Sequence, residues 1–264
     1  MPTPTRAEIA RSIRASFQDE PLLPTVRVIV LSRVPIAGQT KTRLIPALGA
    51  AGAAAFHAAC LDDLLTEIAA WRREAGSRGV SVRLTLSLTP AGAEAAFRVA
   101  GVDVPADADL AAQRGDSLDE RMREALRDGL ADAERALLIG SDLPLLTREH
   151  LELAAQALET HDAVLGPAED GGYYLIGVRG GKSGTDDWEG LFDSGSASDV
   201  IRAQVTVLAR TLARGRALGL RVAQLGTLPD VDTPEDARRI LAHPLAERLS
   251  ARRSIRLLRE RFGG

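Results

Sequence analysis

The sequence has few aromatic residues, a single cysteine and no long run of apolar residues. Aromatics make up only 3% of the chain, so we expect an aliphatic core. The lone Cys60 has no partner for an intramolecular disulfide, which fits a reducing cytoplasm and a buried structural thiol. No stretch approaches the roughly 18 apolar residues of a membrane span, and the N-terminus lacks a signal-peptide core. We therefore expect a cytoplasmic protein with no membrane partner.

The chain also lacks a charge excess and the signatures of several enzyme classes. Its 33 lysines and arginines against 36 aspartates and glutamates leave −3, so we expect no nucleic-acid partner. The GxxxxGK[ST] phosphate loop, the GxGxxG turn, the serine nucleophile elbow, CxxC and HExxH are absent from the sequence. The absence of these motifs disfavours hydrolase and zinc-dependent functions. Four histidines show no metal-ligand spacing and are interpreted as incidental surface or core residues: His57, His150, His161 and His243.

The sequence does contain a regular alternation of predicted strands and helices. Apolar runs predict strands over 26–32, 80–88, 135–140, 162–167, 173–178 and 221–225. Helical spacing or capping signals predict helices over 5–17, 50–75, 117–133 and 199–218, and after Pro90, Thr147 and Thr233. The aspartate-rich stretch before Gln113 is interpreted as a turn region, and 180–198 as a loop.

This alternation predicts the fold class. Helices between strands require a largely parallel or mixed sheet covered on both faces, so we expect a three-layer α/β/α sandwich with a mixed, mostly parallel sheet. We expect an appended N-terminal helix in 1–24, the main domain in 25–243 and a C-terminal helix in 244–264. The basic terminal helices suit a homodimer. In such sheets ligands bind at the carboxyl ends of the strands.

A basic loop, PIAGQTKTRLIP at 35–46, follows the first predicted strand directly. Gly38 lets the backbone come close to a bound group, and Arg33, Lys41 and Arg43 supply cations that suit a polyphosphate. An ordinary basic surface loop explains this segment alone equally well.

Two aspartates at predicted strand ends are candidate Mg²⁺ ligands, with Mn²⁺ as the alternative ion. Asp142 ends the strand RALLIG in the segment GSDLP, where it either binds a metal or caps the turn into the next helix. Asp232 precedes a helix start at which capping explains Thr233 and Pro234 but leaves Asp230 unexplained. If Asp142 and Asp232 bind one ion, they converge from remote segments.

Two further segments contain candidate binding residues. In GPAEDGGYYLIG, the pair Gly171 and Gly172 suggests close approach of the backbone to a ligand, with a simple hairpin turn as the alternative. At most one of Tyr173 and Tyr174 is expected to contact substrate, because neighbouring strand residues point to opposite faces. We expect the segment QRGDSLDERM either to contact the base or substrate or to be only a solvated helix start. Its candidate residues are Gln113, Asp116, Glu120 and Arg121.

Together and in this order, PIAGQTKTRL, QRGDSLDERM, IGSDLPLLT, VLGPAEDGGYYLIG and DVDTPEDA resemble a bacterial family of GT-A-fold, glycosyltransferase-like proteins linked to radical-SAM and arsenosugar gene clusters. More distantly, the chain is similar to phospholactate guanylyltransferase and to the molybdenum-cofactor nucleotidyltransferases. The resemblance covers about residues 26 to 241. It implies a nucleotide-diphospho-sugar transferase fold with the nucleotide at the strand ends.

The resemblance also implies residue roles, which fall into four groups. Phosphates would be held by Gly38, Lys41 and Arg43, and the base would lie near Gln113 and Gly115. Mg²⁺ would be bound by Asp142 and Asp232, and the acceptor side would be lined by Asp170, Gly171 and Gly172. The family's phenylalanine-alanine-lysine is Leu31, Ser32 and Arg33 here, which keeps the charge. Its tryptophan-serine-threonine has no counterpart, which leaves the acceptor open.

Three functions follow from this pattern. In nucleotidyl transfer, an anionic acceptor of phosphate or phosphonate type attacks a nucleoside triphosphate and pyrophosphate leaves. No general base is needed, because Mg²⁺, Lys41 and Arg43 neutralise the developing charge. In glycosyl transfer from a nucleotide sugar, Asp170 would be the base. The third function is non-catalytic nucleotide binding. Asp142 stands outside any DxD pair, which favours nucleotidyl transfer.

Overall fold

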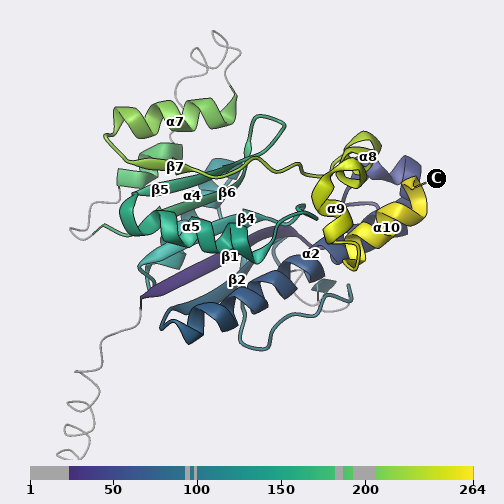
Figure 1. Ribbon diagram of the computed structural model, residues 1–264, viewed down its shortest axis with the longest axis horizontal. Coiled ribbons are helices and arrows are strands. Elements are labelled where there is room, and N and C mark those ends of the chain that lie inside the picture. Colours follow the sequence, from purple (N-terminus) through teal and green to yellow (C-terminus); the bar gives the residue numbers. More distant parts are fainter. Residues whose placement is uncertain (1–23, 93–95, 98–99, 182–186, 193–205, 264) are drawn as a thin grey trace, which may run out of the picture.

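The computed structural model describes residues 24–92, 96–97, 100–181, 187–192 and 206–263 (Figure 1). The strands are β1 (Thr25–Arg33), β2 (Ser81–Thr89), β3 (Asp109–Ala112), β4 (Arg135–Gly140), β5 (Ala163–Pro167), β6 (Tyr173–Arg179) and β7 (Val222–Gln224). The α-helices are α2 (Ile45–Ser77), α4 (Leu118–Leu130), α5 (Arg148–Thr160), α7 (Val207–Ala217), α8 (Pro234–Ala242), α9 (Pro244–Arg248) and α10 (Arg253–Phe262). Short 3₁₀ helices are η1 (Thr42–Leu44) and η2 (Asp187–Phe192).

The strands form one seven-stranded sheet in the order β3-β2-β1-β4-β6-β5-β7. Within the described residues, every neighbouring pair is parallel except those of β6, which runs antiparallel to both β4 and β5. The sheet has an apolar cluster on each face, one with α2 and α5 and the other with α4, η2 and α7. The predicted three-layer α/β fold with a mixed, mostly parallel sheet is therefore confirmed.

The alanine-rich helix α2 is the main covering of one face. The stretch Thr42–Ser77 is the one described helix long and apolar enough to cross a membrane, but half of its most apolar window is buried inside the protein. Small alanines let α2 lie close to the sheet, where its buried residues join the strand residues in one core. This burial is what the core helix of a globular domain shows. Cys60 is free and buried there, as predicted.

The prediction of a single C-terminal helix in 244–264 is wrong, because the chain forms α9 and α10 with a break between them. Ile255 and Leu258 of α10 belong to the same apolar cluster as α2. Just before α10, the buried Arg252 donates to Pro144 O at 2.6 Å and pairs with Glu67 of α2 at 2.7 Å. The C-terminal segment therefore also supports the loop that follows β4.

Two predicted irregular stretches contain regular structure. The turn region before Gln113 includes β3, a four-residue edge strand without β-branched residues, and the loop 180–198 includes η2. The helix predicted over 199–218 is α7 from Val207 onward, and its first part lies outside the described residues. The predicted helix over 5–17 and most of the one after Pro90 also lie outside them.

Candidate active site

A cavity of about 660 Å³ lies where β1 and β4 end and β6 begins. Most of the predicted site residues line it: Arg33, Lys41, Arg43, Gln113, Arg121, Asp142, Tyr173 and Asp232. Asp230, His57 and Tyr174 also line it. Five predicted residues are not among its lining: Gly38, Gly115, Asp170, Gly171 and Gly172.

Lys41 lies between the two predicted metal ligands. Its Nζ is 2.9 Å from Asp142 Oδ2 and 2.9 Å from Asp232 Oδ1, and it donates to Val231 O at 2.5 Å. The side chain is 4% exposed. Burial opposes the ammonium charge, but the negative charges of Asp142 and Asp232 outweigh it and raise the pKa of Lys41 above its usual range. Asp142 and Asp232 thus converge on one buried cation.

The loop before Lys41 fixes its backbone. The buried Thr40 hydroxyl donates to Val34 O at 2.8 Å and accepts from Ile36 N at 3.2 Å, which closes the loop on itself. Lys41 has a φ of 51°, the one positive φ among the described non-glycine residues. Gly38 has a φ of +82°, and a side chain there would meet nothing within 4 Å. This glycine is therefore needed for the turn in this structure, not for close contact with another part of the protein.

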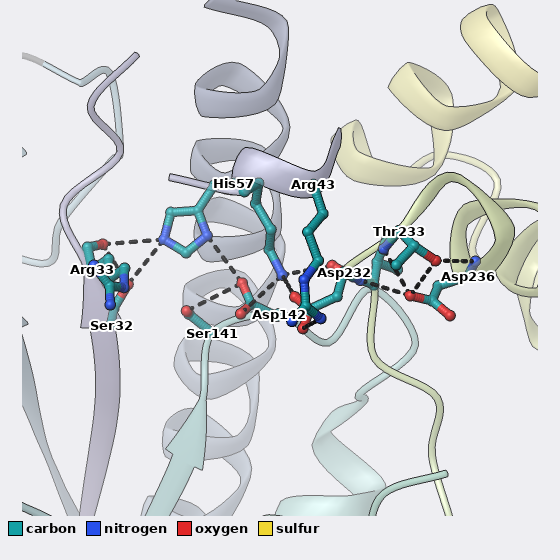
Figure 2. Close-up of polar contacts among 11 residues, drawn as sticks. Ser32, Arg33, Arg43, His57, Ser141, Asp142, Asp232, Thr233 and Asp236 are labelled. Carbon is teal, nitrogen blue, oxygen red and sulfur yellow. Dashed lines mark hydrogen bonds and ion pairs between the residues drawn. The ribbon is translucent and has the colours of Figure 1, made fainter. Parts of the chain in front are cut away.

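Asp142 is held from two sides (Figure 2). Its Oδ1 accepts from His57 Nδ1 at 3.0 Å, and its Oδ2 faces Lys41. Burial opposes ionisation, but the charge of Lys41 and the hydrogen bond from His57 hold the pKa of Asp142 well below its usual range. The helix-cap interpretation of Asp142 is wrong, since Thr147 is the N-cap of α5 and the carboxylate binds Lys41, His57 and Ser141.

Asp232 remains available to the site because other residues cap α8. Thr233 caps the helix and Pro234 occupies the first turn, as the sequence predicted, and Asp236 completes a capping box with Thr233 (Figure 2). Asp232 Oδ2 lies 4.0 Å from a guanidinium nitrogen of Arg43. Asp230 also lines the cavity, where burial and the nearby negative charge of Asp170 raise its pKa.

The donor set fits a divalent ion that is shared with a phosphate ligand. No group of three or more histidine, cysteine, aspartate or glutamate side chains in the described part of the chain could hold a metal alone. Mg²⁺ typically takes one or two carboxylates together with substrate phosphates and water. Asp142 and Asp232 provide those carboxylates, and the ammonium of Lys41 shows that their shared position accepts a cation.

The segment that starts at Gln113 divides into structural and cavity-lining residues. The Gln113 side-chain amide donates to Ser32 O at 3.1 Å and to Ser87 O at 3.0 Å, which joins the ends of β1 and β2. Gly115 has a φ of +119°, and a Cβ there would lie 2.7 Å from Glu120 Cβ. Ser117 and Glu120 form a capping box for α4, and Arg121 donates to Gly115 O at 2.9 Å. The helix start thus explains Gly115, while Gln113 and Arg121 line the cavity.

The glycine pair between β5 and β6 forms a hairpin turn. Asp170 is exposed, and its Oδ1 accepts from Gly172 N at 2.8 Å. Gly171 has a φ of +87°, and a Cβ there would lie 2.7 Å from the Thr206 side chain. The turn itself therefore accounts for these residues, and their acceptor role stays a prediction.

The two tyrosines that follow this turn differ in burial. Tyr174 is buried and its ring packs over Gly166, where a Cβ would lie 2.4 Å from the ring. Tyr173 is only half-buried and lines the cavity. Burial and the charge of Asp119 raise the pKa of Tyr173 to about 12, so its hydroxyl is neutral at physiological pH. The two side chains pack in the apolar clusters on opposite faces of the sheet, so their predicted alternation is confirmed. Both line the cavity, and contact of one of them with substrate stays a prediction.

Sequence reasoning missed His57. Its helix α2 is apolar, and the ring is 2% exposed. Its position on the buried face of an alanine-rich helix was the available signal, because a buried polar side chain needs hydrogen-bond partners. The identity of those partners depends on how α2 packs against β1 and β4.

Comparisons with known proteins agree with this fold. Residues 74–199 match the family described as "Uncharacterized protein conserved in bacteria (DUF2064)". A crystal structure from Desulfovibrio desulfuricans G20, provisionally named a nucleotide-diphospho-sugar transferase, is 30% identical and covers 89% of this chain and 94% of its own, with a TM-score of 0.72. The 4-diphosphocytidyl-2C-methyl-D-erythritol synthase of Anaerococcus prevotii DSM 20548 is 9% identical, and the match covers 81% of this chain and 94% of the synthase, with a TM-score of 0.50. This is a likeness of fold alone.

A curated relative adds an activity to this comparison. The 3-phospho-D-glycerate guanylyltransferase of Phenylobacterium zucineum (strain HLK1) is 34% identical over 135 residues, which are 48% of this chain. The chain spans only 56% of the length of that relative.

Proposed function

Because the chain belongs to the family of the Desulfovibrio protein provisionally named a nucleotide-diphospho-sugar transferase, and its residues 74–199 match DUF2064, we propose that it is a Mg²⁺-dependent nucleotidyltransferase. It transfers a nucleoside monophosphate from a nucleoside triphosphate to a small phosphorylated acceptor. The observation that carries this proposal is the convergence of Asp142 and Asp232 on Lys41 Nζ, at 2.9 Å each, in the cavity at the strand ends. The guanylyltransferase activity of the curated relative favours GTP as donor.

The proposed reaction is an in-line displacement at phosphorus. An oxyanion of the acceptor forms a bond to the α-phosphorus, the bond from that phosphorus to the bridging oxygen breaks, and pyrophosphate leaves with the electron pair. No proton has to move, because the acceptor oxygen is already ionised. Catalysis then rests on alignment and on neutralisation of charge.

Residues of this chain supply most of that neutralisation. Asp142 and Asp232 would hold the metal, which would neutralise part of the triphosphate charge. Lys41 is a buried point charge bound to Asp142, Asp232 and Val231 O, and Arg43 is 74% exposed beside Asp232. Arg43 can therefore turn toward phosphate oxygens, and Lys41 would have to exchange its present partners for them. Gln113 and Arg121 line the same cavity, on the side where we place the base.

Glycosyl transfer is the second candidate, because the Desulfovibrio relative is named for nucleotide-diphospho-sugars. A hydroxyl acceptor would need a base, for which Asp170 is the proposed residue. Asp170 is exposed and hydrogen-bonded within its own turn, so it supports this reaction less directly than Lys41 and the two aspartates support nucleotidyl transfer. We place either reaction in the cytoplasm, in keeping with the single buried cysteine.

The test is a comparison of products. Each nucleoside triphosphate is incubated with Mg²⁺ and 3-phospho-D-glycerate and pyrophosphate is measured; in parallel, nucleotide sugars are assayed for released diphosphate. We expect pyrophosphate, and we expect Asp142→Asn to lower the rate by about 100-fold or more. Asp107→Asn, which removes an exposed partner of Arg72 outside the cavity, is the matched control. Diphosphate from a nucleotide sugar would favour the second candidate, and nucleotide binding without any turnover would favour a binding protein.

A further inference from the structure

His57 is a buried polar side chain with partners at both ring nitrogens. Nδ1 lies 3.0 Å from Asp142 Oδ1, and Nε2 lies 3.1 Å from both Ser32 Oγ and Arg33 O (Figure 2). The ring thus connects α2 to the carboxyl end of β1 on one side and to Asp142, two residues after β4, on the other. Burial of a polar ring among apolar neighbours costs free energy unless such bonds are made.

In this arrangement, the two oxygens of the Asp142 carboxylate have different partners. Oδ1 is committed to the ring, because a carboxylate only accepts and His57 Nδ1 therefore donates to it. Oδ2 is the oxygen that faces the cation position, where Lys41 Nζ lies at 2.9 Å. A rotation of the carboxyl group would break the bond to His57.

Within the described part of the chain, no other contact of this carboxylate fixes its rotation as firmly. The bond from Ser141 Oγ to Asp142 Oδ1 is long, at 3.4 Å, and Ser141 directly precedes Asp142 in the chain, so it does not tie Asp142 to another element. Lys41 approaches the same carboxylate, but its ammonium is shared with Asp232 and with Val231 O. Among the described residues, only His57 joins Asp142 to the end of β1, through Ser32 and Arg33.

We propose that His57 is a positioning residue that fixes the Asp142 carboxylate so that Oδ2 faces a bound divalent cation. This proposal rests on the proposed function, and it assigns His57 a role that acts on the metal through Asp142. Hydrogen-bond partners of metal ligands typically contribute 10- to 100-fold in metal affinity or activity. His57 is expected to contribute to metal affinity on this scale.

Three variants separate positioning from a general role in packing. In His57→Asn the side-chain amide nitrogen takes a place near Nδ1, so it can donate to Asp142 but does not reach β1. In His57→Gln the amide reaches the place of Nε2, so the contact with Ser32 and Arg33 is kept and the donor to Asp142 is lost. His57→Phe keeps the ring and loses both contacts.

The readout is the Kd of Mn²⁺ in the presence of saturating GTP, measured by electron paramagnetic resonance, together with the unfolding midpoint in urea. Positioning predicts that H57N binds Mn²⁺ within a few-fold of wild type, whereas H57Q and H57F bind it about 10- to 100-fold more weakly. It also predicts that H57N and H57Q have similar unfolding midpoints, because each loses one of the two contacts.

The possible results test the positioning role of His57 and the proposed nucleotidyl transfer separately. Equal Mn²⁺ affinity in H57N and H57Q, or affinities that simply follow the unfolding midpoints, would overturn the positioning role while leaving nucleotidyl transfer intact. If wild-type protein binds Mn²⁺ neither alone nor with any nucleoside triphosphate, the proposed function itself fails and the positioning role fails with it.

Discussion

Substitution of Lys41 by methionine tests the electrostatics of the site most directly. The change keeps an unbranched side chain one atom shorter and removes the ammonium that Asp142 and Asp232 share. Removal of one partner from a buried ion pair costs about 3–5 kcal/mol. Asp142 and Asp232 retain 36% and 48% exposure, so water screens part of the loss, and we expect the free energy of unfolding to fall by about 2–3 kcal/mol.

Divalent ions should stabilise K41M much more than wild type. In K41M the position between the carboxylates is open to Mg²⁺, and an ion at 100 times its Kd would add about 2.7 kcal/mol of stability. In wild type the ion has to displace the ammonium, so Mg²⁺ alone should add much less. The measurement is urea unfolding with EDTA and then with Mg²⁺ over a range of concentrations.

Two results would refute this reasoning. One is an EDTA-treated K41M that is as stable as wild type, since the aspartates would then not depend on Lys41. The other is an equal gain from Mg²⁺ in both proteins. The double variant K41M/D142N serves as control, because removal of both charges should recover part of the lost stability.

Two further predictions concern residues beside this pair. Asp230→Asn should stabilise the protein at pH 7, because burial and the charge of Asp170 raise the pKa of this carboxyl above its unfolded value, so the ionised form is disfavoured in the folded state. The gain should vanish below about pH 4, where the carboxyl is protonated even when unfolded. Urea unfolding at both pH values checks this, and a stability gain accompanied by loss of turnover would mark Asp230 as functional. Gly166→Ala should destabilise the protein by about 1–3 kcal/mol through contact with the Tyr174 ring, and unchanged thermal unfolding would contradict that packing.

Much of the fold was predictable because its strands are apolar and bounded by clear turn residues. β1, β4 and β5 are buried on both faces, and such strands appear in a sequence as continuous apolar runs. β3 was not predictable, since DLAA is four residues long, lies at the sheet edge and is stabilised by pairing with β2. The break between α9 and α10 also depends on contacts with distant segments.

The candidate site was predictable in its acidic and basic residues but not in their partners. Asp142, Asp232 and Lys41 follow strand ends or short loops, and parallel strands bring such positions to one edge. The sequence does not show that Lys41 occupies the space between the aspartates, or that His57 reaches Asp142 from the middle of α2. These contacts are set by side-chain packing between segments that lie far apart in the chain.

The antiparallel strand β6 has an evolutionary consequence. Because β6 reverses direction after β5, the two are joined by a tight turn at the same edge as the cavity, where the other connections of the sheet are helices or long crossovers. A tight turn can gain or exchange residues without moving any helix of the scaffold. If the acceptor role predicted for Asp170, Gly171 and Gly172 holds, descendants of one ancestral enzyme can acquire new acceptors by altering this turn while they inherit the donor half unchanged.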